Sequence, residues 1–259
     1  MKKFLSALIY YFIFVALNLS SAYARSDALH QTALLQSLMQ GEFKGSLSVG
    51  ELKKFGDTGI GTFDRVNGEM IFLDGVMYRA LYNGKIEIAP DDETVPFADV
   101  TFFDADITRE NVKNNLNEVL NEIVNEHGRN QFYMAKISGE FNLMHVRSEL
   151  AQNEPFKRLD EALKTDQREF TYKNISGVIV ALYCPEYMGS LNNFGWHMHF
   201  ISEDKLTGGH VLNFEVNNCK IEMDLISEFI MNVPNDASFN NAELGINMRE
   251  RIKEVEGGN

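Results

Sequence analysis

The chain has 259 residues, 44% of them hydrophobic, and a formal net charge of −13 at neutral pH. This acidic balance repels nucleic acid and anionic membrane surfaces, so neither is an expected partner. The length and apolar content fit one large globular domain or two small ones, and the two cysteines, Cys184 and Cys219, are too few for a disulfide framework.

The first 24 residues have the pattern of a secretory signal peptide. Lys2 and Lys3 precede an apolar stretch over residues 4–17, and residues 22–24 (Ala-Tyr-Ala) form a small-x-small cleavage site. The alternative, a membrane anchor, is disfavoured because a span needs about 20 apolar residues and no stop-transfer pattern follows. We expect the leader to be cleaved, which leaves a mature domain over residues 25–259 in the periplasm or outside the cell, without membrane association.

The chain between residues 25 and 103 is predicted to be a short helix followed by hairpins. Apolar residues at helical spacing predict a helix over residues 27–40. Beyond it, short β-rich runs are separated by Asn-Gly and Asp-Gly turns, which are strong hairpin signals between apolar runs. The predicted strands form an antiparallel meander and include residues 61–63, 69–73, 76–80 and 85–88.

The rest of the chain mixes helices and strands. Thr108 is a candidate N-cap, and apolar residues at helical spacing continue to His127 and Gly128, which end the predicted helix. Further helices are expected over residues 156–164 and in the tail after Asn240. The predicted strands cover residues 132–138, 140–147, 176–183, 195–202, 210–215 and 219–231.

These elements predict an α+β fold. Hairpin-linked strands would form mixed or antiparallel sheets, with a few helices packed on them. We expect two closely packed β-rich subdomains, residues 25–128 and 129–259. The sequence leaves open whether Cys184 and Cys219 pair or remain buried thiols.

Three of the six histidines, His197, His199 and His210, lie close together in the sequence. On a strand, positions i and i+2 point to the same face, so His197 and His199 can bind one metal ion. The turn around Gly208 and Gly209 returns the chain, which lets His210 join them from the next strand. Three histidine ligands leave one coordination position open, as in catalytic zinc sites. The pattern therefore predicts a catalytic Zn²⁺ centre.

Two other interpretations of the histidines fit the sequence less well. An isolated H-x-H pair can arise by chance, but a third histidine after a Gly-Gly turn favours a metal. A cupin-like metal oxygenase also uses H-x-H, followed by a glutamate at the spacing of Glu203. A cupin needs a further histidine on a downstream strand, and none follows His210. We expect Glu203 to lie in a solvated turn.

Four segments resemble the alpha-acetolactate decarboxylase family. Residues 56–63 resemble its G-D-F-G-I-G-T-F segment, with Thr58 in place of the usual Phe, and residues 67–75 resemble D-G-E-[LM]-I-x-[LF]-D-G. Residues 96–103 resemble P-F-A-x-V-T-x-F. The histidine stretch, residues 195–211, resembles G-[WY]-H-x-H-F-I-x-x-x-x-x-x-G-G-H-V. Four motifs in the same order at similar spacing are far more specific than H-x-H alone.

The resemblance assigns roles to individual residues. It implies that the three histidines bind zinc, that Thr62 and Glu69 line the site, and that Arg147 is the active-site arginine. It also implies a glutamate brought to the metal from the tail. Glu256 fits this place best, and Glu254 is the alternative. The family further implies a homodimer and conversion of (S)-2-acetolactate, a 2-hydroxy-3-keto acid, to (R)-acetoin and CO₂.

The chemistry of this reaction suits these residue types. Loss of CO₂ leaves an enediolate, which zinc would stabilise as a Lewis acid. Arg147 could orient the substrate carboxylate through its bidentate donors, and Glu69 or Glu256 could return a proton. The principal alternative is a non-catalytic periplasmic zinc-binding protein, which would need neither Glu69 nor Arg147.

Overall fold

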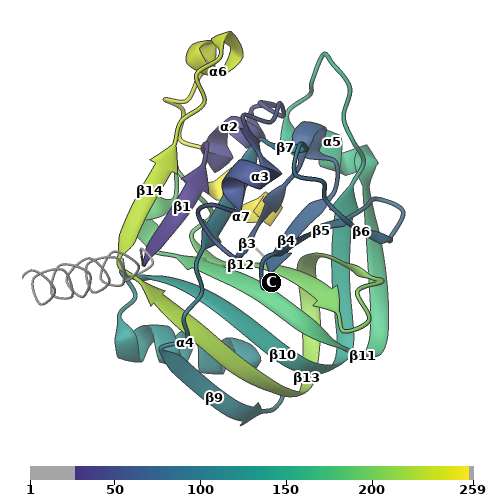
Figure 1. The fold of residues 1–259 in the computed structure, drawn as a ribbon, viewed down its shortest axis with the longest axis vertical. Coiled ribbons are helices and arrows are strands. Elements are labelled where there is room, and N and C mark those ends of the chain that lie inside the picture. Colours follow the sequence, from purple (N-terminus) through teal and green to yellow (C-terminus); the bar gives the residue numbers. More distant parts are fainter. Residues whose placement is uncertain (1–26, 257–259) are drawn as a thin grey trace, which may run out of the picture.

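The computed structural model describes residues 27–256, and the predicted signal peptide lies outside this range. A seven-stranded sheet forms one half of the molecule (Figure 1). Its strand order is β14-β1-β8-β3-β4-β5-β6. The strands are β1 (Ala28–Thr32), β3 (Thr58–Thr62), β4 (Glu69–Leu73), β5 (Val76–Ala80), β6 (Ile86–Ile88), β8 (Phe97–Thr101) and β14 (Glu228–Asn232). All neighbours are antiparallel except the parallel pair β1 and β14.

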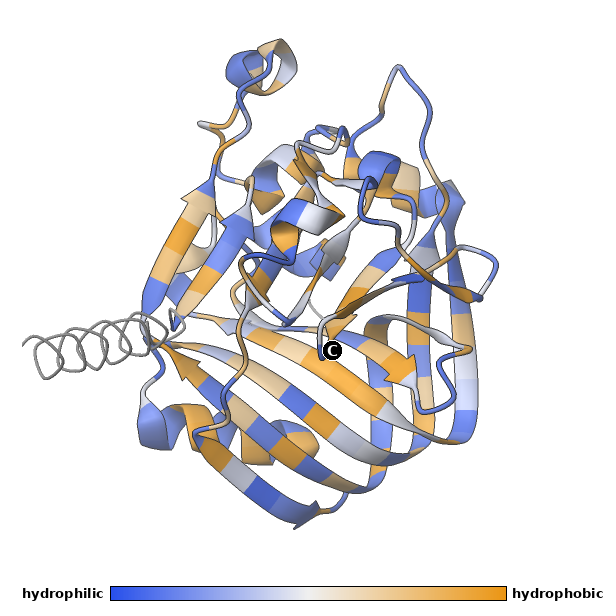
Figure 2. Ribbon diagram, viewed as in Figure 1, coloured by the Kyte–Doolittle hydropathy of each residue, from blue (hydrophilic) through white to orange (hydrophobic). Residues whose placement is uncertain are grey.

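A second sheet curls into a ring in the other half. It contains β9 (Ile107–Val112), β10 (Phe132–Glu149), β11 (Gln167–Cys184), β12 (Gly195–Ser202) and β13 (Gly208–Ile226). Strand β13 pairs with both β12 and β10, so the four long strands close on themselves and β9 extends the sheet beyond β13. Hydrophilic and hydrophobic residues alternate along much of β10, β11 and β13 (Figure 2), whereas residues 197–202 of β12 are all buried.

The remaining elements are short. They are α2 (Leu35–Met39), α3 (Val49–Leu52), α4 (Leu116–His127), α5 (Leu159–Asp166), α6 (Ala237–Asn241), α7 (Arg249–Glu256), the small sheet of β2 (Leu47–Ser48) and β7 (Thr94–Val95), and the 3-10 turns η1 (Asp64–Val66) and η2 (Glu186–Met188). Within residues 27–256, no helix is both long and apolar enough to cross a membrane.

Separate apolar cores join these layers. One core lies between the two large sheets, where Leu29, Ile60 and Ile71 meet Val180 and Ile201. A second fills the ring beneath α4, and a third joins α2, α5 and α7. Cys184 and Cys219 are buried free thiols in different cores, so they do not pair. The predicted α+β class is confirmed.

The structure corrects two predicted helices. Within the predicted helix 27–40, only residues 35–39 are helical, as α2, whereas residues 28–32 form β1, which pairs with β14 and β8 and is buried on both faces. Residues 107–112 form β9, paired with β13, and Thr108 is not a helix N-cap. The helix begins at Leu116, although its predicted end at His127 and Gly128 is correct.

Several strand boundaries also differ from the prediction. Strand β10 is continuous through Gly139, where a break was predicted. A Cβ atom at Gly139 would lie 2.3 Å from the Asn218 carbonyl oxygen, so glycine allows a close strand approach there and does not mark a turn. Strand β11 begins at Gln167, well before residue 176, and β13 runs unbroken through the predicted gap between residues 215 and 219.

Candidate active site and metal centre

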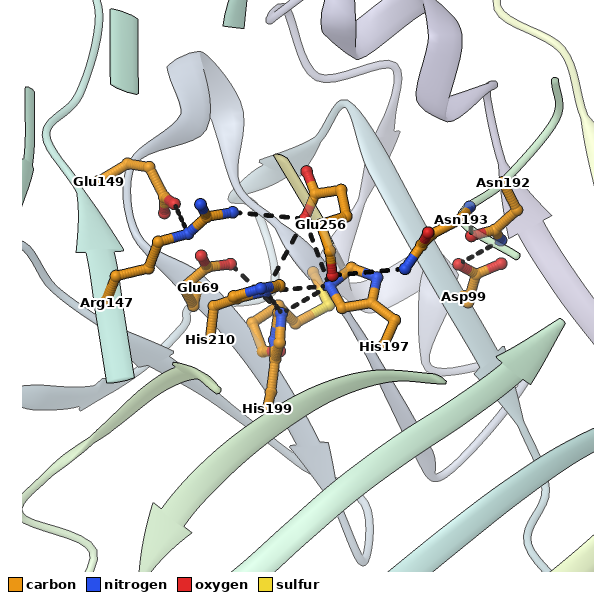
Figure 3. A network of polar contacts seen from close by, with 11 residues as sticks. Glu69, Asp99, Arg147, Glu149, Asn192, Asn193, His197, His199, His210 and Glu256 are labelled. Carbon is orange, nitrogen blue, oxygen red and sulfur yellow. Dashed lines mark hydrogen bonds and ion pairs between the residues drawn. The ribbon is translucent and has the colours of Figure 1, made fainter. Parts of the chain in front are cut away.

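Strands β12 and β13 bring the three histidines together as the sequence pattern predicts. His197 and His199 point to the same face of β12, and His210 on β13 is the register partner of His199. The Nε2 atoms of His197 and His199 are 3.1 Å apart, and His210 Nδ1 is 3.1 Å from the first and 3.3 Å from the second. All three side chains are buried and converge on one point (Figure 3).

This geometry could hold a metal ion. Tetrahedral zinc with bonds of about 2.0–2.1 Å places its nitrogen ligands about 3.3 Å apart, close to the observed spacing. His199 Nδ1 donates to the Met70 carbonyl oxygen at 2.6 Å, which directs the Nε2 lone pair toward the other two rings. Burial lowers the pKa of His199 to about 4 and holds the pKa of His197 and His210 well below the usual value. The rings are therefore neutral, as metal ligation requires.

The hairpin of β3 and β4 adds Thr62 and Glu69, which are register partners. Glu69 Oε2 lies 3.4 Å from His199 Nε2. Burial raises the pKa of Glu69 well above its usual value, and the neighbouring Glu149 carboxylate raises it further. The Thr62 hydroxyl donates to the Gly68 carbonyl oxygen at 2.8 Å, and Thr62 lines the cavity beside Glu69.

Arg147 and Glu256 reach the histidines from two other elements. Arg147 lies on β10 as the register partner of His210. Glu256 ends α7, whose residue Ile252 packs in the core shared with α2 and α5, as does Met248 just before the helix. Its Oε2 atom is 3.6 Å from His197 Nε2, 3.8 Å from His210 Nδ1 and 3.5 Å from Arg147 Nη2.

The two tail glutamates differ sharply. Glu254 is exposed, whereas Glu256 is 6% exposed and lies at the histidines. Burial raises the pKa of Glu256 to about 7, although Arg147 opposes this shift. Asn193 helps to place this residue, because its Nδ2 donates to the Glu256 backbone oxygen at 3.3 Å.

One residue of the site, Glu149, was not predicted from the sequence. It is 6% exposed, lines the same cavity, and places Oε1 3.4 Å from Arg147 Nε. The signal was available, because Glu149 is two positions after Arg147 on a strand and must share its face. Glu203 lies exposed in the turn between β12 and β13, away from the histidines, as expected.

Comparisons with known proteins identify similar sequences. A sequence model described as alpha-acetolactate decarboxylase matches residues 29–246. An alpha-acetolactate decarboxylase of Methanosarcina mazei is 39% identical over 89% of this chain and 81% of its own length. One from Lactococcus lactis subsp. lactis is 37% identical over 84% of this chain and 93% of its own length.

Solved structures share the fold. The crystal structure of alpha-acetolactate decarboxylase from Bacillus subtilis strain 168 superposes with a TM-score of 0.84 at 31% identity, covering 90% of this chain and 100% of that one. A Staphylococcus aureus protein, described as of unknown function and similar to alpha-acetolactate decarboxylase, superposes with a TM-score of 0.83 at 34% identity. It covers 88% of this chain and all of its own.

Proposed function

Because the chain belongs to the alpha-acetolactate decarboxylase family, we propose that it converts (S)-2-acetolactate to (R)-acetoin and CO₂ with a zinc ion held by His197, His199 and His210. The family and the enzyme class predicted from the sequence, a carboxy-lyase, are confirmed. The observation that carries the proposal is that three buried, neutral imidazoles lie beside the Arg147 guanidinium and two buried glutamates with raised pKa values.

The three histidines suit a metal that must remain strongly positive, because neutral imidazoles do not reduce its charge as thiolates would. Bound there, zinc would supply a Lewis acid for the negative charge that decarboxylation leaves behind. Thr62, on the adjoining hairpin, would form one wall of the substrate cavity.

Arg147 is proposed to bind the substrate carboxylate. Its guanidinium remains charged at any physiological pH and offers paired donors to the two carboxylate oxygens. At 6% exposure it lies where water cannot screen the interaction. Holding the carboxylate out of the plane of the neighbouring ketone would align the breaking carbon–carbon bond with the carbonyl π system.

A protonated glutamate is proposed to complete the reaction. When CO₂ leaves, the electron pair of the broken bond stays on carbon, which then takes a proton. Glu69 and Glu256 both have raised pKa values and flank the histidines from different elements. Either can deliver a proton from one side only, which would account for a single product stereoisomer.

A zinc-binding protein without catalysis is the alternative, and the buried charges argue against it. Zinc binding needs neither Arg147 nor Glu69, yet both are buried beside the histidines at a desolvation cost. Perturbed ionisable groups gathered in one cavity are typical of catalytic sites. The buried charges thus support an enzyme. The signal-peptide pattern supports a periplasmic or secreted location for it, and the family resemblance supports a homodimer.

The proposal is tested by acetoin formation from racemic 2-acetolactate by the chain from residue 25 onward. We expect zinc-loaded protein to consume one enantiomer and release one CO₂ per acetoin. Arg147→Leu should retain zinc and lose turnover. A folded, zinc-loaded wild-type protein that forms no acetoin would contradict the proposal and favour the zinc-binding alternative.

A further inference from the structure

Glu149 presents a problem for a site that binds an anionic substrate. It is a buried acidic side chain, 6% exposed, that lines the cavity with His197 and His199. Figure 3 shows the Arg147 guanidinium between Glu149 on one side and Glu256 on the other. A carboxylate substrate paired with Arg147 would meet the negative charge of Glu149 at the same place.

Glu149 does not hold Arg147 by a hydrogen bond. Its Oε1 atom is 3.4 Å from Arg147 Nε, and that nitrogen makes no hydrogen bond to any residue between 27 and 256. Glu149 is thus a buried acidic side chain close to the Arg147 guanidinium, and it does not clamp that guanidinium.

Decarboxylation explains why such a charge is useful. The substrate carboxylate becomes neutral CO₂ as the carbon–carbon bond breaks, while the electron pair moves away toward the ketone. An arginine that binds only the carboxylate therefore stabilises the ground state more than the transition state, which slows the reaction. A negative charge beside that arginine weakens this stabilisation and is relieved as the carboxylate charge disappears.

We propose that Glu149 balances the charge of Arg147, so that the guanidinium orients the substrate carboxylate without binding it tightly. This inference rests on the proposed function. In this role Glu149 acts through Arg147. The role is distinct from binding the metal and from donating the proton.

The test compares Glu149→Gln with wild type and with Glu140→Gln, a matched change at an exposed position of the same strand. Glutamine keeps the shape and removes the charge. At an effective dielectric constant of 20 and a separation of about 8 Å, removing this repulsion predicts a kcat about ten- to thirtyfold lower together with a lower KM. Glu149→Asp keeps the charge and should remain closer to wild type in both parameters.

Binding supplies a readout that does not depend on turnover. The probe is 2,3-dihydroxy-2-methylbutanoate, in which the ketone is reduced so that CO₂ cannot leave, and calorimetry on zinc-loaded protein gives its dissociation constant. We expect Glu149→Gln to bind this carboxylate about ten- to thirtyfold more tightly and to bind neutral acetoin unchanged. Glu140→Gln should bind both as wild type does.

Two outcomes overturn the inference. Weaker carboxylate binding by Glu149→Gln, with a lower kcat, would mean that Glu149 only holds Arg147 in place. Unchanged kcat and unchanged binding would mean that it does neither. If the wild-type protein forms no acetoin, the proposed reaction fails, while the carboxylate affinities still decide whether Glu149 opposes an anion at Arg147.

Discussion

Replacing Asp99 with asparagine should flatten the pH dependence of the free energy of unfolding. Asp99 lies on β8, is fully buried, and accepts a hydrogen bond from Asn192 Nδ2 at 2.9 Å. Gln31 accepts from the same amide, and the buried Cys184 thiol is nearby. Burial raises the pKa of Asp99 from 3.8 to about 7 despite the Asn192 hydrogen bond.

The sign follows from proton binding. Between about pH 4 and 7 the folded protein keeps the Asp99 proton that the unfolded chain releases, so stability falls as the pH rises through this window. Integrating the difference from pH 5 to pH 8 gives a loss of about 2.5 kcal/mol. Asparagine cannot ionise, so the variant should avoid this loss. Other carboxyls with raised pKa values, such as Asp224, contribute equally to both proteins.

Urea unfolding at pH 5, 6, 7 and 8 measures the effect. The difference in unfolding free energy between wild type and Asp99→Asn should change by about 2.5 kcal/mol across this range. Asp92→Asn, at an exposed position, is the control and should show no such change. Parallel pH curves for wild type and Asp99→Asn would refute the reasoning, whatever the absolute stability of the variant.

Three further predictions follow from other parts of the structure. Arg147→Lys should lower kcat/KM about a hundredfold with zinc content unchanged, because an ammonium cannot offer paired donors to a carboxylate. Steady-state kinetics and metal analysis of the same samples check this prediction. Gly139→Ala should lower the free energy of unfolding by about 2 kcal/mol, because the alanine Cβ would clash with the Asn218 carbonyl oxygen. An unchanged melting temperature would contradict the close approach of the two strands. A thiol reagent should titrate both Cys184 and Cys219 in urea without reductant, and fewer than two thiols per chain would contradict their free state.

The local patterns that predicted the site were those with a clear period. Strand β12 occupies the predicted residues 195–202, and the two-residue period of a strand places His197 and His199 on one face. The meander around Glu69 was predicted from a different signal, the Asn-Gly and Asp-Gly turns between apolar runs.

The features that could not be predicted from the sequence depend on contacts between residues far apart in the chain. The apolar spacing over residues 27–40 fits a helix, and it is the pairing with β14 and β8 that makes residues 28–32 a strand. The hydrogen bonds that join Gln31, Asp99 and Asn192 connect residues far apart in the chain, so no local motif marks them. Glu149 could have been found by extending the alternation of β10 past Arg147, but its contact with the guanidinium needed the structure.

Metal removal and return is the most direct test of the central claim that His197, His199 and His210 hold a catalytic zinc ion. The chain from residue 25 onward would be assayed as isolated, after stripping with a chelator, and after addition of one equivalent of Zn²⁺. We predict about one metal per chain, loss of acetoin formation on stripping, and recovery with zinc in wild type but not in His199→Ala. Full activity in metal-free protein, or equal recovery in His199→Ala, would contradict the account.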